Sequence, residues 1–201
     1  MSRERLGVFG GTFDPPHLGH LILAQEACAQ LRLARVLWVL TPIPPHKLGQ
    51  AITPVAHRLV MLQLALQDEP RFELSRLELD RPGPHYTADT LRAMQDLYPS
   101  ADLILLLGGD SLRDLPTWRF APELVAACRE IGVMRRPGDS VDVAAVDRQV
   151  PGVRARVRFV DAPLLEIASS EIRRRIRGGQ PFRYYLPPAV YRYILEKNLY
   201  R

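Results

Sequence analysis

Short apolar runs alternate along this chain with segments whose apolar positions recur every three or four residues. Continuous apolar runs are typical of strands buried on both faces of a parallel sheet, and the longer spacing is typical of helices. Strands are predicted at residues 6–9, 36–40, 71–79, 102–107, 131–134 and 156–160. Helices are predicted from near His17, Thr53, Thr87, Glu123, Ser169 and Pro187. This alternation predicts an α/β fold, a doubly wound parallel sheet with right-handed crossovers.

Length and composition favour one globular domain over residues 1–201, with a small helical C-terminal part at about 169–201. The longest aliphatic run, Leu103 to Leu107, is too short to span a membrane. Cys28 and Cys128 stand alone, without metal or redox spacing, and are predicted to be buried thiols in a reducing compartment. We therefore expect a cytoplasmic protein. The sequence leaves open whether its copies assemble into a homo-oligomer.

Glycines end two of the predicted strands. The first strand ends in Gly10-Gly11-Thr12 and the fourth in Gly108-Gly109-Asp110. In the usual doubly wound order these strands are neighbours, and the chain direction reverses between them. Ligands bind at that switch point, above the carboxyl ends of the strands. The two glycine-bearing ends are therefore predicted to form the walls of a binding site.

The loop after the first strand has the composition of an anion site. Gly10 and Gly11 can adopt positive φ and let a ligand approach the bare backbone. Asp14 and Pro15 are predicted as the N-cap and first residue of the following helix, whose N-terminus would attract an anion. The side chains of His17 and His20 project from one side of the first turn, and Gly19 leaves room beside them.

Two common phosphate motifs are excluded here. A P-loop requires a lysine after its glycines, and the redox dinucleotide fingerprint requires G-x-G-x-x-G with a later acid. Neither pattern is present. A zinc site is disfavoured because no third ligand lies nearby in the sequence. The simplest alternative is a capped helix that carries two solvated histidines.

The stretch GGTFDPPHLGH resembles the HxGH signature of the nucleotidyltransferase superfamily, in which both histidines and the helix N-terminus hold a nucleotide triphosphate. IASSEIR (167–173) resembles the superfamily's second triphosphate motif, usually ISSTxIR, but has Ala168 in place of the first serine. Further stretches extend the resemblance over nearly the whole chain to the bacterial nicotinate mononucleotide adenylyltransferases. These stretches are PPHK (44–47), HYTADTL (85–91), GGDSL (108–112), LPTW (115–118) and RRPG (135–138).

The resemblance implies a role for each matching residue. Catalytic roles fall on His17, His20 and Arg173. The residues implied in ATP binding are Gly10, Gly11, Thr12, Phe13, Gly19, Gly109, Asp110, Ser169 and Ser170. The residues implied in binding the mononucleotide are Lys47, Tyr86, Thr87, Trp118 and Arg136, with Trp118 stacked on the pyridine ring.

These roles imply adenylyl transfer from ATP to nicotinate mononucleotide in NAD biosynthesis. The sequence shows few clustered carboxylates, so Mg²⁺ is expected to be carried mainly by the ATP phosphates. Phosphopantetheine adenylyltransferase and cytidylyltransferases share the first motif and are the alternatives. A net charge of +5 suits anionic ligands but also nucleic acid. A nucleic-acid-binding module is disfavoured, because no aromatic residues interleave the basic run at 173–177.

Overall fold

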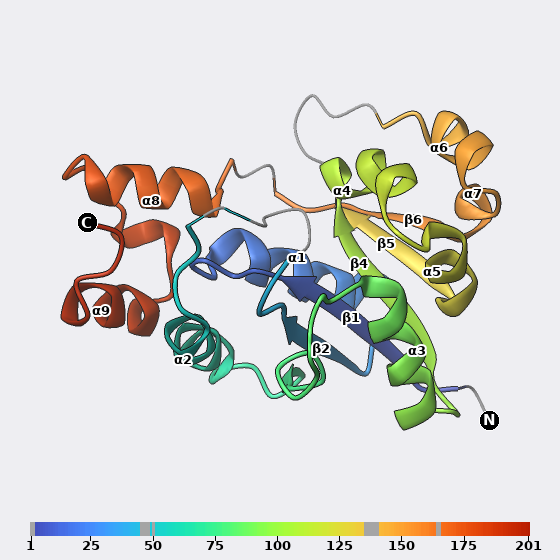
Figure 1. Cartoon of the computed structure of the whole chain (residues 1–201), viewed down its shortest axis with the longest axis horizontal. Helices are drawn as coiled ribbons and strands as arrows, with labels where there is room; N and C mark the ends of the chain where they lie inside the picture. Colours follow the sequence, from blue (N-terminus) through green and yellow to red (C-terminus); the bar gives the residue numbers. More distant parts are fainter. Residues whose placement is uncertain (1–2, 45–48, 50, 135–140, 164–165) are drawn as a thin grey trace.

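A computed structural model describes residues 3–44, 49, 51–134, 141–163 and 166–201 of the chain. Its centre is a six-stranded parallel sheet in the order β3-β2-β1-β4-β5-β6 (Figure 1). The strands are β1 Arg5–Gly11, β2 Arg35–Leu40, β3 Phe72–Ser75, β4 Asp102–Gly108, β5 Glu130–Met134 and β6 Val157–Val160. The predicted doubly wound α/β fold is confirmed, including the pairing of the first strand with the fourth.

Helices follow the strands in chain order. Those up to the fourth strand are α1 Leu18–Gln30, α2 Val55–Leu66 and α3 Thr87–Leu97. The later ones are α4 Gly109–Asp114, α5 Ala121–Ala127, α6 Val143–Gln149, α7 Val153–Arg156, α8 Ser169–Arg177 and α9 Pro188–Glu196. In the described ranges, 3₁₀ turns at Leu115–Thr117 and Arg183–Tyr185 lie between helices. None of the helices in the described ranges is long and apolar enough to cross a bilayer.

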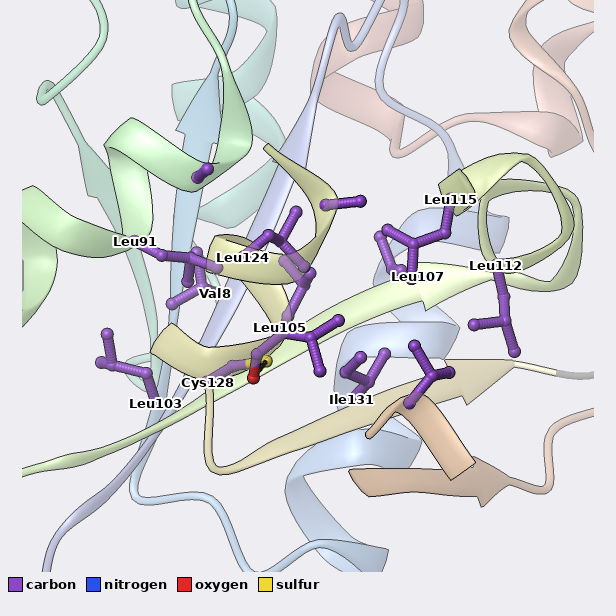
Figure 2. Packing of buried hydrophobic residues seen from close by; sticks show 14 of the residues in the cluster. Val8, Leu91, Leu103, Leu105, Leu107, Leu112, Leu115, Leu124, Cys128 and Ile131 are labelled. Carbon is purple, nitrogen blue, oxygen red and sulfur yellow. Dashed lines mark hydrogen bonds between the residues drawn. The ribbon is translucent and has the colours of Figure 1, made fainter. Parts of the chain in front are cut away.

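Successive side chains of a strand point to opposite faces of the sheet, and this alternation builds two cores. On one face, Leu105 and Leu107 of β4 pack with α3, α4 and α5, as Figure 2 shows. On the other face, Ile104 and Leu106 of the same strand pack with α1 and α2. The predicted burial of both cysteines is confirmed: Cys28 lies in the second core and Cys128 in the first.

The C-terminal helices pack on α2 rather than on the sheet (Figure 1). Adjacent residues of α2 belong to different clusters: Leu62 packs in the core that contains Ile104 and Leu106, and Met61 packs in a third cluster. Ile172 of α8 with Val190 and Ile194 of α9 completes this third cluster. Residues at the end of the chain therefore reach the segments around β1.

Two predicted boundaries are wrong, and the helices between β5 and β6 were missed. The third strand covers Phe72–Ser75 instead of 71–79. Thr87 is the first residue of α3, with Tyr86 at the N-cap. Two short helices, α6 and α7, lie between β5 and β6, where no helix was predicted. Each has only one buried residue, so neither shows a clear apolar periodicity.

The sheet opens at the predicted switch point. The ladder between β1 and β4 ends at Val8–Leu105. The neighbouring ladders continue to Gly11–Leu40 and to Gly108–Met134. The carboxyl ends of the two central strands therefore part from one another, and this is where a doubly wound fold binds its ligands.

Candidate active site

Two stacked histidines mark the start of α1. Their ring centroids are 3.6 Å apart with an interplanar angle of 22°. His17 is the N-cap residue and is only 5% exposed, and His20 lies one turn later. The main-chain N–H of His17 donates to Nδ1 of His20 over 3.2 Å. An accepting Nδ1 carries no proton, so the proton of a neutral His20 ring lies on Nε2 and can be donated to an anion.

Gly19 makes room for the imidazole ring of His17. A Cβ at Gly19 would lie 3.2 Å from Cε1 and Nδ1 of His17 and 3.6 Å from Cβ of Ile167. A Cβ there would press on the His17 ring and would be in ordinary van der Waals contact with Ile167. Because Ile167 lies just before α8, the two sequence motifs meet in the fold at this point.

The glycines at the end of β1 act differently from the prediction. Neither Gly10 nor Gly11 has positive φ; Phe13 takes that conformation, with φ of 47°. A Cβ at Gly11 would lie 2.9 Å from Cζ of Phe13, whereas a Cβ at Gly10 would meet no atom within 4 Å. Gly11 therefore makes room for the buried Phe13 ring, and Gly10 leaves the backbone open to a ligand. Phe13 itself can offer only main-chain groups, because its ring packs on Phe9 and Trp38.

Asp14 and Pro15 do not start the helix as predicted. The helix begins at Leu18, with His17 as its N-cap. The carboxylate of Asp14 is instead occupied by two distant partners, the hydroxyl of Tyr200 at 2.7 Å and the main-chain N–H of Thr53 at 3.3 Å. The local sequence favours Asp14 as a helix N-cap, but in the fold its carboxylate accepts hydrogen bonds from distant residues instead.

The second motif lies against this loop. Arg173 donates through Nη1 to the main-chain oxygen of Asp14 over 2.6 Å, and Ser169 donates through Oγ to that of Pro15 over 2.9 Å. The hydroxyl proton of Ser169 is therefore used within the protein. Ala168 at the N-cap of α8 provides no side-chain cap, which leaves the first N–H groups of the helix, including that of Ser170, for a ligand.

The arginines that follow Arg173 in α8 are mostly exposed to solvent. Arg174 and Arg175 both pair with Glu171, at 2.7 and 2.8 Å. Hydrogen bonds from Arg174 and Arg175 lower the pKa of the half-buried Glu171 carboxyl. Arg173 differs from these neighbours because its guanidinium turns toward the loop before α1.

The opposite wall is formed by the end of β4. A Cβ at Gly108 would meet no atom within 4 Å, and Gly109 is the buried first residue of α4. Asp110 follows on the surface and pairs with Arg113 at 3.1 Å. Thr12 lies on the β1 side, where its main-chain oxygen accepts a hydrogen bond from Arg58.

A group of aromatic residues lies at the start of α3. The Arg119 guanidinium lies against both Tyr86 and Phe120, with its carbon 5.3 and 5.0 Å from their ring centroids, and the two rings contact each other edge-to-face at 6.0 Å. Because Trp118 precedes Arg119, the LPTW stretch and the HYT stretch adjoin here, as their shared predicted role requires. His85 beside them is buried, and burial lowers its pKa despite the nearby Glu78 carboxylate.

Two predicted substrate residues, Lys47 and Arg136, lie outside the described residues. Within the described ranges, no three histidine, cysteine or acidic residues gather as metal ligands. Asp110 is the carboxylate that the described structure places at the switch point. One carboxylate, phosphate oxygens and water together form a ligand set that suits a divalent cation brought by a nucleotide.

Comparison with known proteins identifies the family. A family model described as cytidylyltransferase-like matches residues 8–175. A Thermomicrobium roseum protein named probable nicotinate-nucleotide adenylyltransferase is 50% identical over 98% of this chain and 92% of its own length. The chain belongs to the nicotinate-nucleotide adenylyltransferase family. A Roseiflexus sp. protein of the same name is 43% identical, and both chains are covered completely.

A solved structure shares the fold of this adenylyltransferase. Plasmodium falciparum nicotinic acid mononucleotide adenylyltransferase complexed with NaAD superposes with a TM-score of 0.82 at 20% identity. The match covers 98% of this chain and 97% of that chain. The relatives at 50% and 43% identity confirm the resemblance seen in the sequence and the prediction of a nucleotidyltransferase, and the solved structure confirms the fold.

Two residues of this adenylyltransferase that contact the candidate site were missed in the sequence. Arg58 is 2% exposed and donates to four main-chain oxygens, those of Thr12, Thr41, Pro42 and Thr53. The sequence did indicate the burial of Arg58, because Arg58 lies three and four positions before Met61 and Leu62 and so shares the apolar face of the helix with them. Tyr200 gave no signal, because its partner Asp14 is 186 positions away.

Proposed function

We propose that this chain transfers the adenylyl group of ATP to nicotinate mononucleotide, giving nicotinate adenine dinucleotide and pyrophosphate in NAD biosynthesis. The observation that carries the proposal is the stacked pair His17 and His20 at the N-terminus of α1, beside the parted ends of β1 and β4. Full-length relatives named nicotinate-nucleotide adenylyltransferase support the choice of acceptor. The solitary buried thiols support a cytoplasmic location.

The triphosphate would lie over the start of α1. His20 would donate from Nε2, and Arg173 keeps further N–H groups beyond the one that it gives to Asp14. His17, Ser170 and the N–H groups at the start of α8 would complete the set of donors. Gly10, Gly11, Gly19 and the main chain of Thr12 and Phe13 would admit the phosphates, and Ser169 would hold the loop through Pro15.

The other half of ATP would lie toward β4. Gly109 would admit the ribose, and Asp110 would accept its hydroxyls or the water molecules of the metal. Mg²⁺ would neutralise charge on the phosphate oxygens, which hold it together with water. The protein's own part is to orient the two substrates and to stabilise the leaving pyrophosphate.

The acceptor would bind beside Tyr86 and Thr87, with its pyridine ring against Trp118. Lys47 and Arg136 are proposed to hold its phosphate. This phosphate is the nucleophile and is largely dianionic at neutral pH, since its second pKa is about 6. No general base is needed for an in-line attack on the α-phosphorus. Positioning alone can supply roughly 7–11 kcal/mol of the barrier reduction.

A pyrophosphate-release assay tests the proposal. The protein is incubated with ATP, Mg²⁺ and one acceptor at a time: nicotinate mononucleotide, nicotinamide mononucleotide or phosphopantetheine. A parallel series replaces ATP with CTP. We expect the highest kcat/KM with ATP and nicotinate mononucleotide. Faster turnover with phosphopantetheine or with CTP would show that the chain performs another transfer on the same fold. Binding of RNA without any transfer would contradict the assignment as an enzyme.

A further inference from the structure

The carboxylate of Asp14 holds together segments from three parts of the chain. It is 5% exposed, and a buried carboxylate without partners is costly. Its Oδ1 accepts from the hydroxyl of Tyr200 at 2.7 Å and its Oδ2 from the N–H of Thr53 at 3.3 Å. Burial and the adjoining Asp14 carboxylate raise the pKa of Tyr200, so the hydroxyl keeps its proton and acts as the donor.

The C-terminal segment contacts the same loop at three points. Tyr200 donates a hydrogen bond to the side chain of Asp14, and Arg173 donates one to the main-chain oxygen of Asp14. Ser169 donates one to the main-chain oxygen of Pro15. The loop residues 12–17 lie in neither strand nor helix, and Phe13 within them has positive φ. Long-range hydrogen bonds therefore fix the path of the chain into His17.

Arg58 fixes the other side of this loop. It joins the main-chain oxygen of Thr12 to those of Thr41 and Pro42, which follow β2, and to that of Thr53. Burial lowers the pKa of Arg58, and the nearby Asp14 and Tyr200 oppose that shift. Arg58 thus holds the loop from α2, and Tyr200 holds it from the C-terminus through the carboxylate of Asp14.

We propose that Asp14 is a positioning residue of the active site, and that Tyr200 acts through it to set the geometry of the triphosphate-binding loop. The proposal rests on the proposed function for the role of that loop. A misplacement of about 1 Å far from the reacting atoms can lower a rate by about 10²-fold. Because Arg173 bonds the main chain of Asp14 itself, a shift of Asp14 moves a triphosphate ligand as well as the loop.

The test removes one hydroxyl, in the variant Tyr200→Phe. The matched control is Tyr193→Phe, which removes a hydroxyl that bonds Nδ1 of His57 at 2.8 Å instead of a residue of the loop. Calorimetry measures the Kd of ATP, the transfer assay measures the KM of the mononucleotide, and thermal unfolding measures Tm. We expect Tyr200→Phe to raise the Kd of ATP and lower kcat by about fivefold to tenfold each. The KM of the mononucleotide should stay within about twofold, and the control should change none of these values by more than about twofold.

A purely structural role predicts another result. The proposal is overturned if Tyr200→Phe binds ATP as the unaltered chain does, or if both variants weaken ATP binding equally while lowering Tm. An equal rise in KM for both substrates also overturns it. The calorimetric measurement needs no acceptor, so it decides the role of Tyr200 even if nicotinate mononucleotide proves not to be the substrate. Failure of the proposed function appears separately, as an absence of pyrophosphate release from the unaltered chain.

Discussion

At the scale of single residues, the candidate site depends on which hydrogen-bonding groups are left for a ligand. Ser169 looked like a phosphate ligand in the sequence, but its hydroxyl proton is donated to Pro15. In His20 a partner sets the tautomer, because the hydrogen bond from the main-chain N–H of His17 to Nδ1 places the proton of the neutral ring on Nε2. A residue's type suggests a role, and its partners in the fold decide which atoms can perform it.

Replacement of His20 by alanine should lower turnover much more than it weakens binding. Loss of one preorganised donor to developing charge costs about 10²–10³-fold in kcat. We expect a loss of that size for His20→Ala, with the Kd of ATP changed by less than about threefold. Steady-state kinetics and calorimetry measure the two quantities. His57→Ala, which alters a histidine of α2 that is bonded to Tyr193, serves as the control. An unchanged kcat in His20→Ala would contradict the role of the imidazole.

Trp118 tests the other half of the site. Removal of its indole should raise the KM of nicotinate mononucleotide about tenfold, because stacking and the burial of the pyridine ring are lost. The KM of ATP should remain unchanged in Trp118→Ala. Kinetics with each substrate varied in turn separate the two constants. An increase confined to the KM of ATP would exclude stacking on the acceptor.

At the scale of elements, the strand–loop–helix from β1 to α1 was largely readable from the sequence. The apolar run, the glycine pair and the histidine spacing located the strand, the switch point and the first turn. The path between them was not readable. Asp14 is bonded by Tyr200 and Thr53, and Arg58 closes the loop from α2, so long-range contacts override local capping preference.

Gly10 and Gly11 should respond differently to the same substitution. A Cβ at Gly10 meets open space, so Gly10→Ala should unfold within about 2 °C of the unaltered chain. Its methyl group lies where the phosphates would approach, and we expect the Kd of ATP to rise about tenfold. A Cβ at Gly11 would press on the Phe13 ring at 2.9 Å, so Gly11→Ala should lose about 1–3 kcal/mol of stability.

Calorimetry with ATP and denaturant unfolding measure the two effects. If Gly10→Ala binds ATP normally, the phosphates do not approach the end of β1. If Gly11→Ala is fully stable, the Phe13 ring has room that the structure does not show.

At the scale of the whole molecule, one hydrophobic core lies on each face of the sheet, and a third cluster joins α8 and α9 to α2. The third cluster brings the second motif and the C-terminus to the loop after β1. Hydrophobic patterning predicted the two central layers because strands and long helices have clear periods. It did not predict that Met61 and Leu62 would serve different clusters, since that depends on what packs against α2.

The buried thiol of Cys128, in the first core, makes the unfolding free energy of the chain depend on pH. It is 1% exposed, and burial raises the pKa of its thiol to about 11. An unfolded chain would ionise this thiol near its ordinary value of about 8.5–9, whereas the folded chain keeps it neutral. The unfolded state therefore binds fewer protons in this interval, and stability falls as pH rises from about 9 to 11.

We expect the unaltered chain to lose about 2–3 kcal/mol more unfolding free energy over this interval than Cys128→Ala. Urea unfolding at pH 8, 9, 10 and 11 measures the difference. Equal pH dependence in the two proteins would show that the thiol ionises as readily in the folded chain as in the unfolded one.

The central claim is that the histidines and main-chain amides at the start of α1 hold the triphosphate of a nucleotide. A crystal structure with a non-hydrolysable ATP analogue and Mg²⁺ tests it most directly. The account predicts nitrogen atoms of His17 and His20 within hydrogen-bond distance, about 3.2 Å or less, of phosphate oxygens above the parted ends of β1 and β4. An analogue bound elsewhere, or imidazole rings that face away from its phosphates, would contradict the account.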